Sequence, residues 1–456
     1  MSLSLAFILF LTAMITSIIL DFSMIPALLA GLLCFGSVGI KKGFSLSQIC
    51  KMCISGLKSS IIVIQVMCII GFVTAVWRVS GTITLFVYYG IKIITPSLFL
   101  LVAFILSCFL SYALGTSFGV AGTVGVIFMA LARSGGVNTV ITAGVLMSGI
   151  YFGDRGSPVS SSANMVAGVT GTDIYGNVRR MMKSAIIPFL ITMCVYTFLS
   201  FSNPINSVNP ELVASFEKEF VLSPWSLLPA AFMLILPLLK VKILFSMGTS
   251  VISGILVSWL VQKTPLLEVF KICVFGYKAD GTGLSSILNG GGLVSMLEII
   301  IILMISSSYS GIFNGTDMLN DMQKKISSAC SRFGRFTIMV AMSLVSSMIF
   351  CNQTIATLIC ADLMRKPYLD GGGSKEELAI DIENSVILIA CMIPWCIGCS
   401  VPLSFFGETF RSIPYAIYMY AIPITYFFTK KLRYKSEYTC YLERSENQSN
   451  EKEIKK

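Results

Sequence analysis

Long apolar runs alternate with short polar connectors along almost the whole chain. A helix needs roughly 20 apolar residues to cross a ~30 Å hydrocarbon core, and about eleven runs approach that length. The pattern therefore predicts an all-α polytopic membrane protein with about 10–12 transmembrane helices. Because the first run has no basic flank and a second follows at once, we expect no cleavable signal peptide. The runs are Leu3–Leu20, Phe22–Ile40, Ile61–Trp77, Pro96–Leu114, Ser184–Phe201, Trp225–Leu239, Ile243–Val261, Leu293–Ser307, Phe336–Phe350, Val386–Cys399 and Ile413–Phe428.

The composition and the placement of charge fit a lipid environment. Only 12% of the 456 residues are charged and the mean hydropathy is +0.83, whereas soluble globular proteins carry about 25% charged residues. The net charge of +10 lies in short loops, which follows the positive-inside rule and argues against a nucleic-acid partner. The same rule predicts a multi-pass plasma-membrane protein with both termini in the cytoplasm, from Lys41, Lys42, Lys51 and Lys58 and from Lys430, Lys431, Arg433 and Lys435.

Two stretches of the chain resemble each other. Phe44–Gly56 and Thr264–Gly276 are both short amphipathic segments that end in glycine and precede an apolar run. The connector that follows is poor in charge in the first case (Val79–Thr95) and basic in the second (Gly315–Arg335), so the two halves are expected to have opposite orientations. The predicted organisation is a two-helix unit (1–40), a first inverted repeat (41–202), linker helices (203–262), a second inverted repeat (263–428) and a cytoplasmic tail (429–456).

Polar, helix-breaking segments interrupt the apolar runs at corresponding places in the two halves. Gly115–Thr123 and Gly153–Pro158 interrupt the first half, and Phe350–Thr357 and Pro394–Pro402 interrupt the second. Glycine and proline disfavour helix, and irregular backbone at membrane depth is tolerated only where it is buried or lines a cavity. Paired interruptions of this kind predict discontinuous helices that hold a transport site near the bilayer midplane. Their breaking residues are Gly115, Gly119, Gly153, Pro158, Pro394 and Pro402.

At these breaks the sequence resembles the NhaC-type sodium/proton antiporter family of the ion transporter superfamily. The resemblance implies exchange of Na⁺ for H⁺, although related proteins move organic solutes such as dicarboxylates or amino acids. Asn352 stands where the family often has an acidic residue, and Cys396 stands where it tends to have a polar one; both departures favour the organic-solute alternative. The segments that carry the resemblance are Gly115–Gly119, Gly122–Thr123, Gly149–Pro158, Thr170–Asp173, Glu383–Ser385 and Ile393–Trp395.

Asp154 is the strongest candidate for a cation-binding and proton-exchanging carboxylate. An ionisable residue inside a membrane segment is costly and therefore indicates function, although an ion pair with the adjacent Arg155 is the structural alternative. Burial disfavours the charged carboxylate and a bound cation favours it, so one group can exchange H⁺ for Na⁺. Further candidate cation or substrate ligands are the acids Glu298 and Glu383 and the neutral groups of Thr116, Ser117, Thr123, Ser157, Asn164, Asn352, Gln353, Thr354 and Ser385.

Other polar residues favour structural roles. Asp173 is expected to cap a helix or pair with cytoplasmic basic residues, Asp362 to lie at a solvated end, and Trp77 and Trp225 to anchor span ends at the interface. The chain has no histidine and no phosphate-binding G-x-x-x-x-G-K-[ST] motif, which argues against a zinc site and an ATP-driven pump. We therefore expect a transporter rather than an enzyme, with no cofactor and with lipid, Na⁺ and H⁺ as its partners. A small organic solute and a homodimer remain open.

Overall fold

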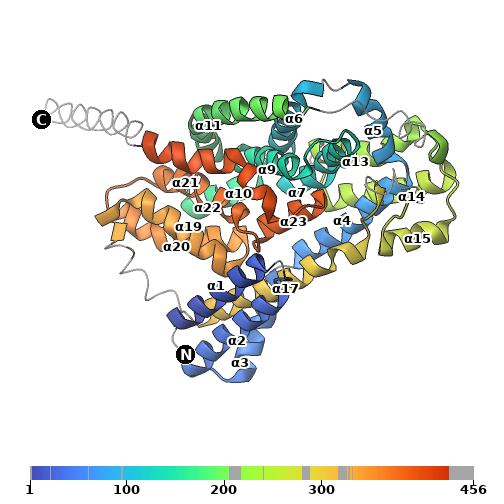
Figure 1. Ribbon diagram of the computed structural model, residues 1–456. Helices are drawn as coiled ribbons and strands as arrows, with labels where there is room; N and C mark the ends of the chain where they lie inside the picture. Colours follow the sequence, from blue (N-terminus) through green and yellow to red (C-terminus); the bar gives the residue numbers. More distant parts are fainter. Residues whose placement is uncertain are drawn as a thin grey trace, which may run out of the picture.

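The computed structural model describes residues 3–20, 22–59, 61–93, 96–204, 217–239, 241–279, 288–316, 326, 329–330 and 332–430 (Figure 1). Within these ranges the regular structure is helical, apart from one antiparallel bridge between Tyr277 and Gly290. The tail beyond residue 430 and most of the basic connector predicted over 315–335 lie outside the described residues.

The described helices suit a membrane. Three of them are long and apolar enough to cross it, within Ser117–Ser134, Ile174–Ser202 and Leu293–Phe313, and two bent pairs pass the same test together. The bent pairs are Ile64–Val79 with Thr82–Tyr89 and Lys375–Met392 with Ile397–Phe406. Six shorter apolar helices accompany them: Leu5–Ser17, Ile25–Lys41, Phe99–Leu114, Pro224–Pro237, Leu244–Leu260 and Arg335–Phe350. The prediction of an all-α polytopic membrane protein is confirmed.

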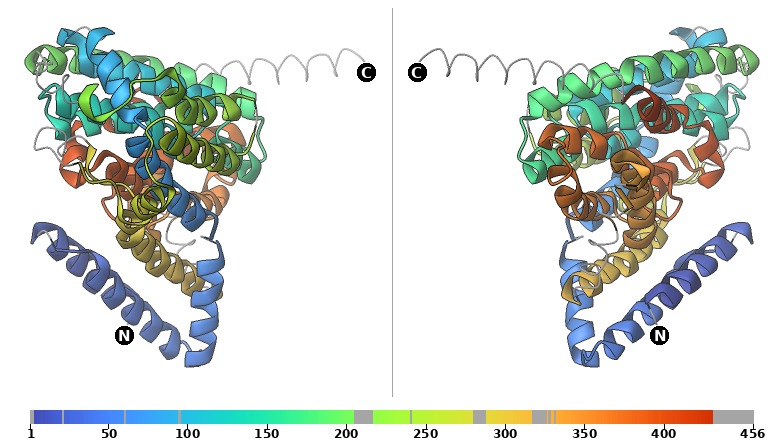
Figure 2. Two further views of the ribbon diagram at one scale, coloured as in Figure 1. Left: turned by 90° about the vertical axis from the view of Figure 1, so that its right-hand side faces the viewer. Right: turned by 90° about the vertical axis from the view of Figure 1, so that its left-hand side faces the viewer.

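Helices α1 (Leu3–Ile19), α2 (Ile25–Lys41) and α3 (Leu46–Ser59) extend from one side of the bundle (Figure 2). They attach through α17 (Leu293–Gly315), which packs on α2 and α3, while α15 (Leu266–Phe275) packs on α4 (Ile61–Val79). Further elements are α5 (Thr82–Ile93), η1 (Pro96–Leu98), η3 (Pro224–Leu227), α13 (Leu228–Leu238), α14 (Ile243–Leu260) and η6 (Phe410–Tyr415).

The same backbone break occurs twice. Helix α6 (Phe99–Leu114) ends at Gly115 in the left-handed conformation, and α19 (Arg335–Phe350) ends in the same way at Cys351. The next residue is extended in both cases, and its side chain accepts hydrogen bonds from the first turn of the following helix: Thr116 caps α7 (Ser117–Val120) and Asn352 caps α20 (Gln353–Leu369). Capping satisfies amides that the break leaves without a helical partner.

A second break follows in each half. Helix α9 (Thr139–Gly156) gives way to α10 (Ser161–Thr170), which ends at a left-handed Gly171. In the other half α21 (Lys375–Glu383), α22 (Val386–Ile389) and η5 (Ala390–Met392) give way to α23 (Ile397–Phe406), which ends at a left-handed Gly407.

The two halves keep one register through both breaks. Cys351 stands 236 positions after Gly115 (351 − 115), and Gly407 stands 236 positions after Gly171 (407 − 171). The bounds of α6 and α19, and of α10 and α23, differ by the same number. The contacts are reciprocal, because α10 packs on α20 and α21 whereas α23 packs on α7, α8 (Val126–Ser134) and α9.

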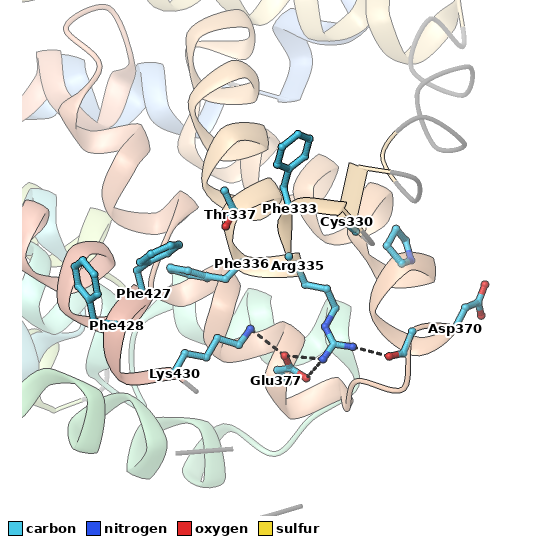
Figure 3. Close-up of a pocket in the computed structure, with 13 residues that line it drawn as sticks. Cys330, Phe333, Arg335, Phe336, Thr337, Asp370, Glu377, Phe427, Phe428 and Lys430 are labelled. Atoms are coloured by element: carbon cyan, nitrogen blue, oxygen red, sulfur yellow. Dashed lines mark hydrogen bonds and ion pairs between the residues drawn. The ribbon is translucent and has the colours of Figure 1, made fainter. Parts of the chain in front are cut away.

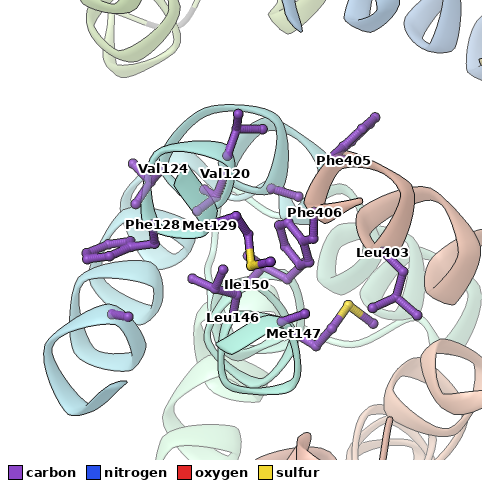
Figure 4. Packing of buried hydrophobic residues seen from close by; sticks show 14 of the residues in the cluster. Val120, Val124, Phe128, Met129, Leu146, Met147, Ile150, Leu403, Phe405 and Phe406 are labelled. Atoms are coloured by element: carbon purple, nitrogen blue, oxygen red, sulfur yellow. The ribbon is translucent and has the colours of Figure 1, made fainter. Parts of the chain in front are cut away.

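The elements that carry the breaks meet in the middle of the bundle, where Figure 1 shows α9, α10, α22 and α23 together. Buried side chains join α7 and α8 to α9 and α23 in one hydrophobic cluster (Figure 4). Phe406 of α23 fits against the π-helical turn η2 (Ala121–Gly125), where a Cβ on Gly125 would lie 2.4 Å from its ring. Close packing here fixes the positions of the two breaks relative to each other.

Three residues predicted as helix breaks lie inside helices. Gly119 is within α7 and precedes η2, and Gly153 is within α9, where a Cβ would come 2.0 Å from the Ser111 backbone carbon of α6. Pro402 lies within α23. A proline provides no amide for the carbonyl four residues earlier, and that carbonyl, on Gly398, accepts a hydrogen bond from Tyr151 instead.

Two other predictions need correction. The apolar run Val386–Cys399 is not one helix, because residues 393–396 leave helical geometry at the predicted breaking residue Pro394. Trp77 is not at an interface: it is buried, and its indole Nε1 donates to Ser250 Oγ at 2.9 Å. Its ring fills space between α4 and α14, which sequence spacing cannot reveal. The prediction that Asp173 caps a helix is confirmed, since it accepts from the Gly176 amide at the start of α11 (Ile174–Ser202).

The contact between α3 and α17 gives a stability prediction. A Cβ on Gly311 would lie 1.9 Å from the Met52 carbonyl oxygen, so Gly311→Ala should separate the helices and destabilise the protein by about 1–3 kcal/mol. Gly248→Ala in α14 is the control, since a Cβ there has no neighbour within 4 Å. Thermal unfolding of the two purified variants in detergent measures the difference, and equal midpoints would contradict the predicted packing.

Candidate functional site

Asp154 lies in the last turn of α9, directly before the break, and its side chain is buried. Ser160 and Ser162, at the start of α10, point their hydroxyls back at it. Ser160 Oγ lies 3.3 Å from Oδ1, and Ser162 Oγ lies 3.2 Å from Oδ1 and 3.3 Å from Oδ2. The turn between the two helices therefore wraps small polar groups around one carboxylate.

Gln353 brings the other half of the chain to the same carboxylate. Its Nε2 donates to Asp154 Oδ2 at 3.4 Å and to the Ile387 carbonyl at 2.8 Å. Because a carbonyl oxygen only accepts, the amide must present its NH₂ group to both. Ser162 and Gln353 are half-buried, whereas Asp154 is buried.

Arg155 is fully buried and does not pair with Asp154. Its guanidinium donates to Asn384 Oδ1, to Ser184 Oγ at 2.7 Å, to the Met181 carbonyl at 3.2 Å and to Tyr418 Oη at 3.3 Å. The ion pair considered for these adjacent residues is absent, because successive helical residues point in different directions. The Arg155 guanidinium is thus held next to Asp154 by hydrogen bonds to neutral groups alone.

Glu383 is the second buried carboxylate of this region. Its side chain is fully buried at the end of α21, and neither oxygen has a hydrogen-bond partner. The charged groups that interact with it electrostatically are Arg155 and Asp154. A buried carboxylate without any donor is rare in folded proteins and calls for an explanation. The amide Nδ2 of the adjacent Asn384 also lacks a partner.

Apart from Gln353 and the exposed Thr354, the neutral residues predicted as ligands divide into two groups. Ser117 is buried at the start of α7, at the position that corresponds to Gln353 by the 236-residue register. The others hold the breaks in shape. Their contacts are Thr116 with the Gly119 amide, Thr123 with the Gly119 carbonyl, Ser157 with the Tyr112 carbonyl, Asn164 with the Pro158 and Ser160 carbonyls, Asn352 with the Thr354 and Ile355 amides, and Ser385 with the Asp381 carbonyl.

Two predicted residues lie away from this cluster. Glu298 is exposed on α17 and accepts from Ser23 Oγ at 2.8 Å in the turn between α1 and α2. The Thr354 side chain is exposed at the start of α20. Neither side chain contacts Asp154, because each points outward from its own helix.

Sequence reasoning missed several residues that the fold brings in. Ser160 and Ser162 were visible as a serine-rich stretch after the break, but their aim at Asp154 depends on the turn. Arg155 was considered only as an ion-pair partner, and Asn384 only as part of a motif. A carboxylate network at the far end of α21 was also missed, because its sequence, Lys375–Glu383, is as polar as a surface loop.

That network borders a cavity of about 970 Å³ between α19, α20, α21 and the helix over 417–430 (Figure 3). Glu377 accepts from Arg335 at 3.2 Å and from Lys430 at 2.9 Å. Asp381 accepts from Lys430 and Tyr368, and from Tyr426 at 2.9 Å. The two carboxylates of this network are paired with Arg335 and Lys430. We therefore interpret the cavity as part of a structural contact between these helices. Among the described residues, no three Cys, Asp or Glu side chains gather to bind a metal ion.

Comparison with known proteins adds an independent line of evidence. The model of the Na⁺/H⁺ antiporter family matches residues 149–429. An uncharacterized Na⁺/H⁺ antiporter of Haemophilus influenzae is 28% identical over 76% of this chain and 77% of its own length. The Na⁺/H⁺ antiporter NhaC of Alkalihalophilus pseudofirmus is 25% identical over 81% of this chain and 82% of its own, and the malate-2H⁺/Na⁺-lactate antiporter of Bacillus subtilis is 26% identical over 78% of each.

The burial of Arg155 gives a prediction about stability. Arg155→Leu removes the guanidinium that donates to the Asn384 and Ser184 oxygens and should cost about 1–3 kcal/mol of unfolding free energy. Arg179→Leu, on the exposed face of α11, is the matched control and should unfold like the wild type. Thermal unfolding in detergent compares them; a wild-type midpoint for Arg155→Leu would show that the buried hydrogen bonds are dispensable.

Proposed function

Because the chain belongs to the Na⁺/H⁺ antiporter family, we propose that it exchanges Na⁺ for H⁺ at Asp154. The observation that carries the proposal is one buried carboxylate surrounded by hydroxyl and amide groups where breaks from both halves meet. Hard cations prefer oxygen donors, and half-helix ends with opened backbone supply them in secondary transporters. Na⁺ and H⁺ then compete for the same carboxylate, which couples their movements.

The Na⁺-bound and the protonated forms of Asp154 require different surroundings. In the described conformation Asp154 receives hydrogen bonds from Ser160, Ser162 and Gln353, and these donors suit a carboxylate without a cation. To bind Na⁺, the serine hydroxyls must turn their lone pairs inward and the Gln353 amide must turn its Oε1 toward the ion. That turn breaks the Gln353–Ile387 bond, so cation binding alters the contact between α20 and α22 whereas protonation leaves it in place.

We infer that 41–202 and 263–428 are inverted repeats, preceded by a two-helix unit over 1–40, joined by linker helices over 203–262 and followed by the tail over 429–456. The register of 236 residues between 99–171 and 335–407 and the reciprocal contacts of α10 and α23 support the presence of a repeat. A two-fold relation in the membrane plane allows one half to rock against the other around a fixed site. We place the protein in the plasma membrane with both termini in the cytoplasm, on the basis of its basic loops.

A small organic solute is the second candidate cargo. It is supported by the similarity to a Bacillus subtilis protein named as a malate-2H⁺/Na⁺-lactate antiporter, and by the capping role of Asn352, which leaves no acid at the second-half break. Uptake of radiolabelled dicarboxylates and amino acids into proteoliposomes tests it. Na⁺/H⁺ exchange that is undiminished without any solute would exclude the organic cargo as the main activity.

The central test replaces the carboxylate. Asp154→Asn keeps the shape of the side chain but removes its charge and its exchangeable proton, so Na⁺-driven proton movement in everted vesicles should fall to background. Asp362→Asn, at an exposed position on α20, is the control and should transport normally. With expression confirmed by immunoblot, wild-type exchange by Asp154→Asn would disprove the assignment.

The serines around Asp154 provide a finer test. Ser160→Ala and Ser162→Ala each remove one oxygen ligand, worth about 1 kcal/mol or roughly a fivefold weaker apparent affinity for Na⁺. Ser161 is exposed between them and has no contact with Asp154, so Ser161→Ala should leave the affinity unchanged. The half-saturating Na⁺ concentration for proton movement measures all three, and equal effects would contradict the proposed ligand set.

A further inference from the structure

Glu383 is a buried carboxylate that Na⁺ binding at Asp154 does not employ. Both of its oxygens are buried without a hydrogen-bond donor. A carboxylate anion without donors or a paired cation is strongly disfavoured in a buried site. In the described conformation Glu383 must therefore carry a proton.

The surroundings of Glu383 contain one group that can stabilise its anion. Of the elements that pack on α21, α10 and α22 carry no ionisable side chain. Arg335 of α19, Tyr368 of α20, and Tyr426 and Lys430 of the helix over 417–430 bond to Glu377 and Asp381. The remaining charged groups of α20 and α11 are exposed, except for the half-buried Arg180: Asp362, Arg365, Lys366, Arg179 and Lys183. The charges that act on Glu383 are those of Arg155 and Asp154 on α9.

Arg155 now bonds to Asn384, the residue next to Glu383. Ser385, which follows Asn384, already departs from helical geometry with φ −125° and ψ −87°. A modest change of the backbone there can therefore exchange Asn384 for Glu383 as the partner of Arg155. Release of the proton from Glu383 would supply the anion that Arg155 lacks. Arg155 thus has a neutral partner, Asn384, when Glu383 is protonated, and a charged partner, Glu383, when that residue is ionised.

Cation binding acts on this same segment. The Ile387 carbonyl that Gln353 holds lies four residues beyond Glu383, on α22. Na⁺ at Asp154 requires Gln353 to release that carbonyl, which frees the kink around Ser385. Protonated Asp154 and Na⁺-bound Asp154 both carry no net charge, so the link between the two carboxylates runs through this backbone segment.

We propose that Glu383 is a second proton-carrying residue of the exchanger, so that two protons leave when one Na⁺ binds. The step balances as protonated Asp154 and protonated Glu383 plus Na⁺ giving the Asp154 carboxylate with bound Na⁺, the Glu383 carboxylate on Arg155, and two H⁺. Each cycle then moves one net charge across the membrane. This proposal rests on the proposed exchange at Asp154 and adds its stoichiometry.

Proton release on Na⁺ binding tests the proposal with the full-length protein in detergent and a weak buffer containing a pH indicator. The wild type should release two protons per bound Na⁺, and Glu383→Gln should release one while still binding Na⁺. Glu376→Gln, in the first turn of the same helix, should release two. One proton from the wild type, or two from Glu383→Gln, would overturn the proposal.

Two further measurements distinguish failure of this proposal from misfolding of the variant and from failure of the Asp154 site. In proteoliposomes, a potential set with potassium and valinomycin should drive Na⁺ exchange by the wild type but not by Glu383→Gln; equal responses to the potential would refute the second proton. Should Glu383→Gln fail to fold, Glu383→Asp keeps an ionisable group and should still release two protons, and release of one would count against the role. Na⁺ binding by Asp154→Asn would instead disprove the Asp154 site itself, whatever Glu383 does.

Discussion

A helix that breaks inside a membrane must satisfy the backbone groups that the break exposes, because no water is available there to do so. This requirement organises the centre of the molecule. Thr116 and Asn352 cap the helices that follow the first break of each half. At the second break of each half, Ser157 and Trp395 donate hydrogen bonds to the Tyr112 and Met348 carbonyls, which lie in the helices α6 and α19 that precede the first break. The breaks are thereby held together as a rigid frame for polar side chains.

Both halves contain the same pair of backbone breaks, but the polar side chains at these breaks differ. By the 236-residue register, Asp154 corresponds to Ala390 and Arg155 corresponds to Cys391. One half therefore supplies the carboxylate and the buried cation, and the other half supplies Gln353 as a partner. Such an arrangement gives a single site in which both halves participate, so any relative movement of the halves changes the surroundings of Asp154.

Electrostatics link this site to its immediate interior. Arg155 places a permanent positive charge next to Asp154, yet its hydrogen bonds go to neutral groups. A buried cation without a paired anion is costly, and the charge of Arg155 acts on the donor-free carboxylate of Glu383. In the proposed exchange, the balance among these three groups changes when H⁺ or Na⁺ binds, and a small ion can thereby bias the position of a helix segment.

The sequence alone determined the membrane environment, the helical class and the places where the runs break, and it made Asp154 the candidate acid. These follow from composition and from local backbone preference, which act over a few residues. The tertiary structure decided which polar residues face that acid. Ser160, Ser162 and Gln353 reach it because the breaks cross, whereas Glu298 on α17 turns to Ser23 and Trp77 is buried against Ser250. The direction of a side chain and its neighbours from 199 residues away depend on packing, and packing is a property of the whole fold.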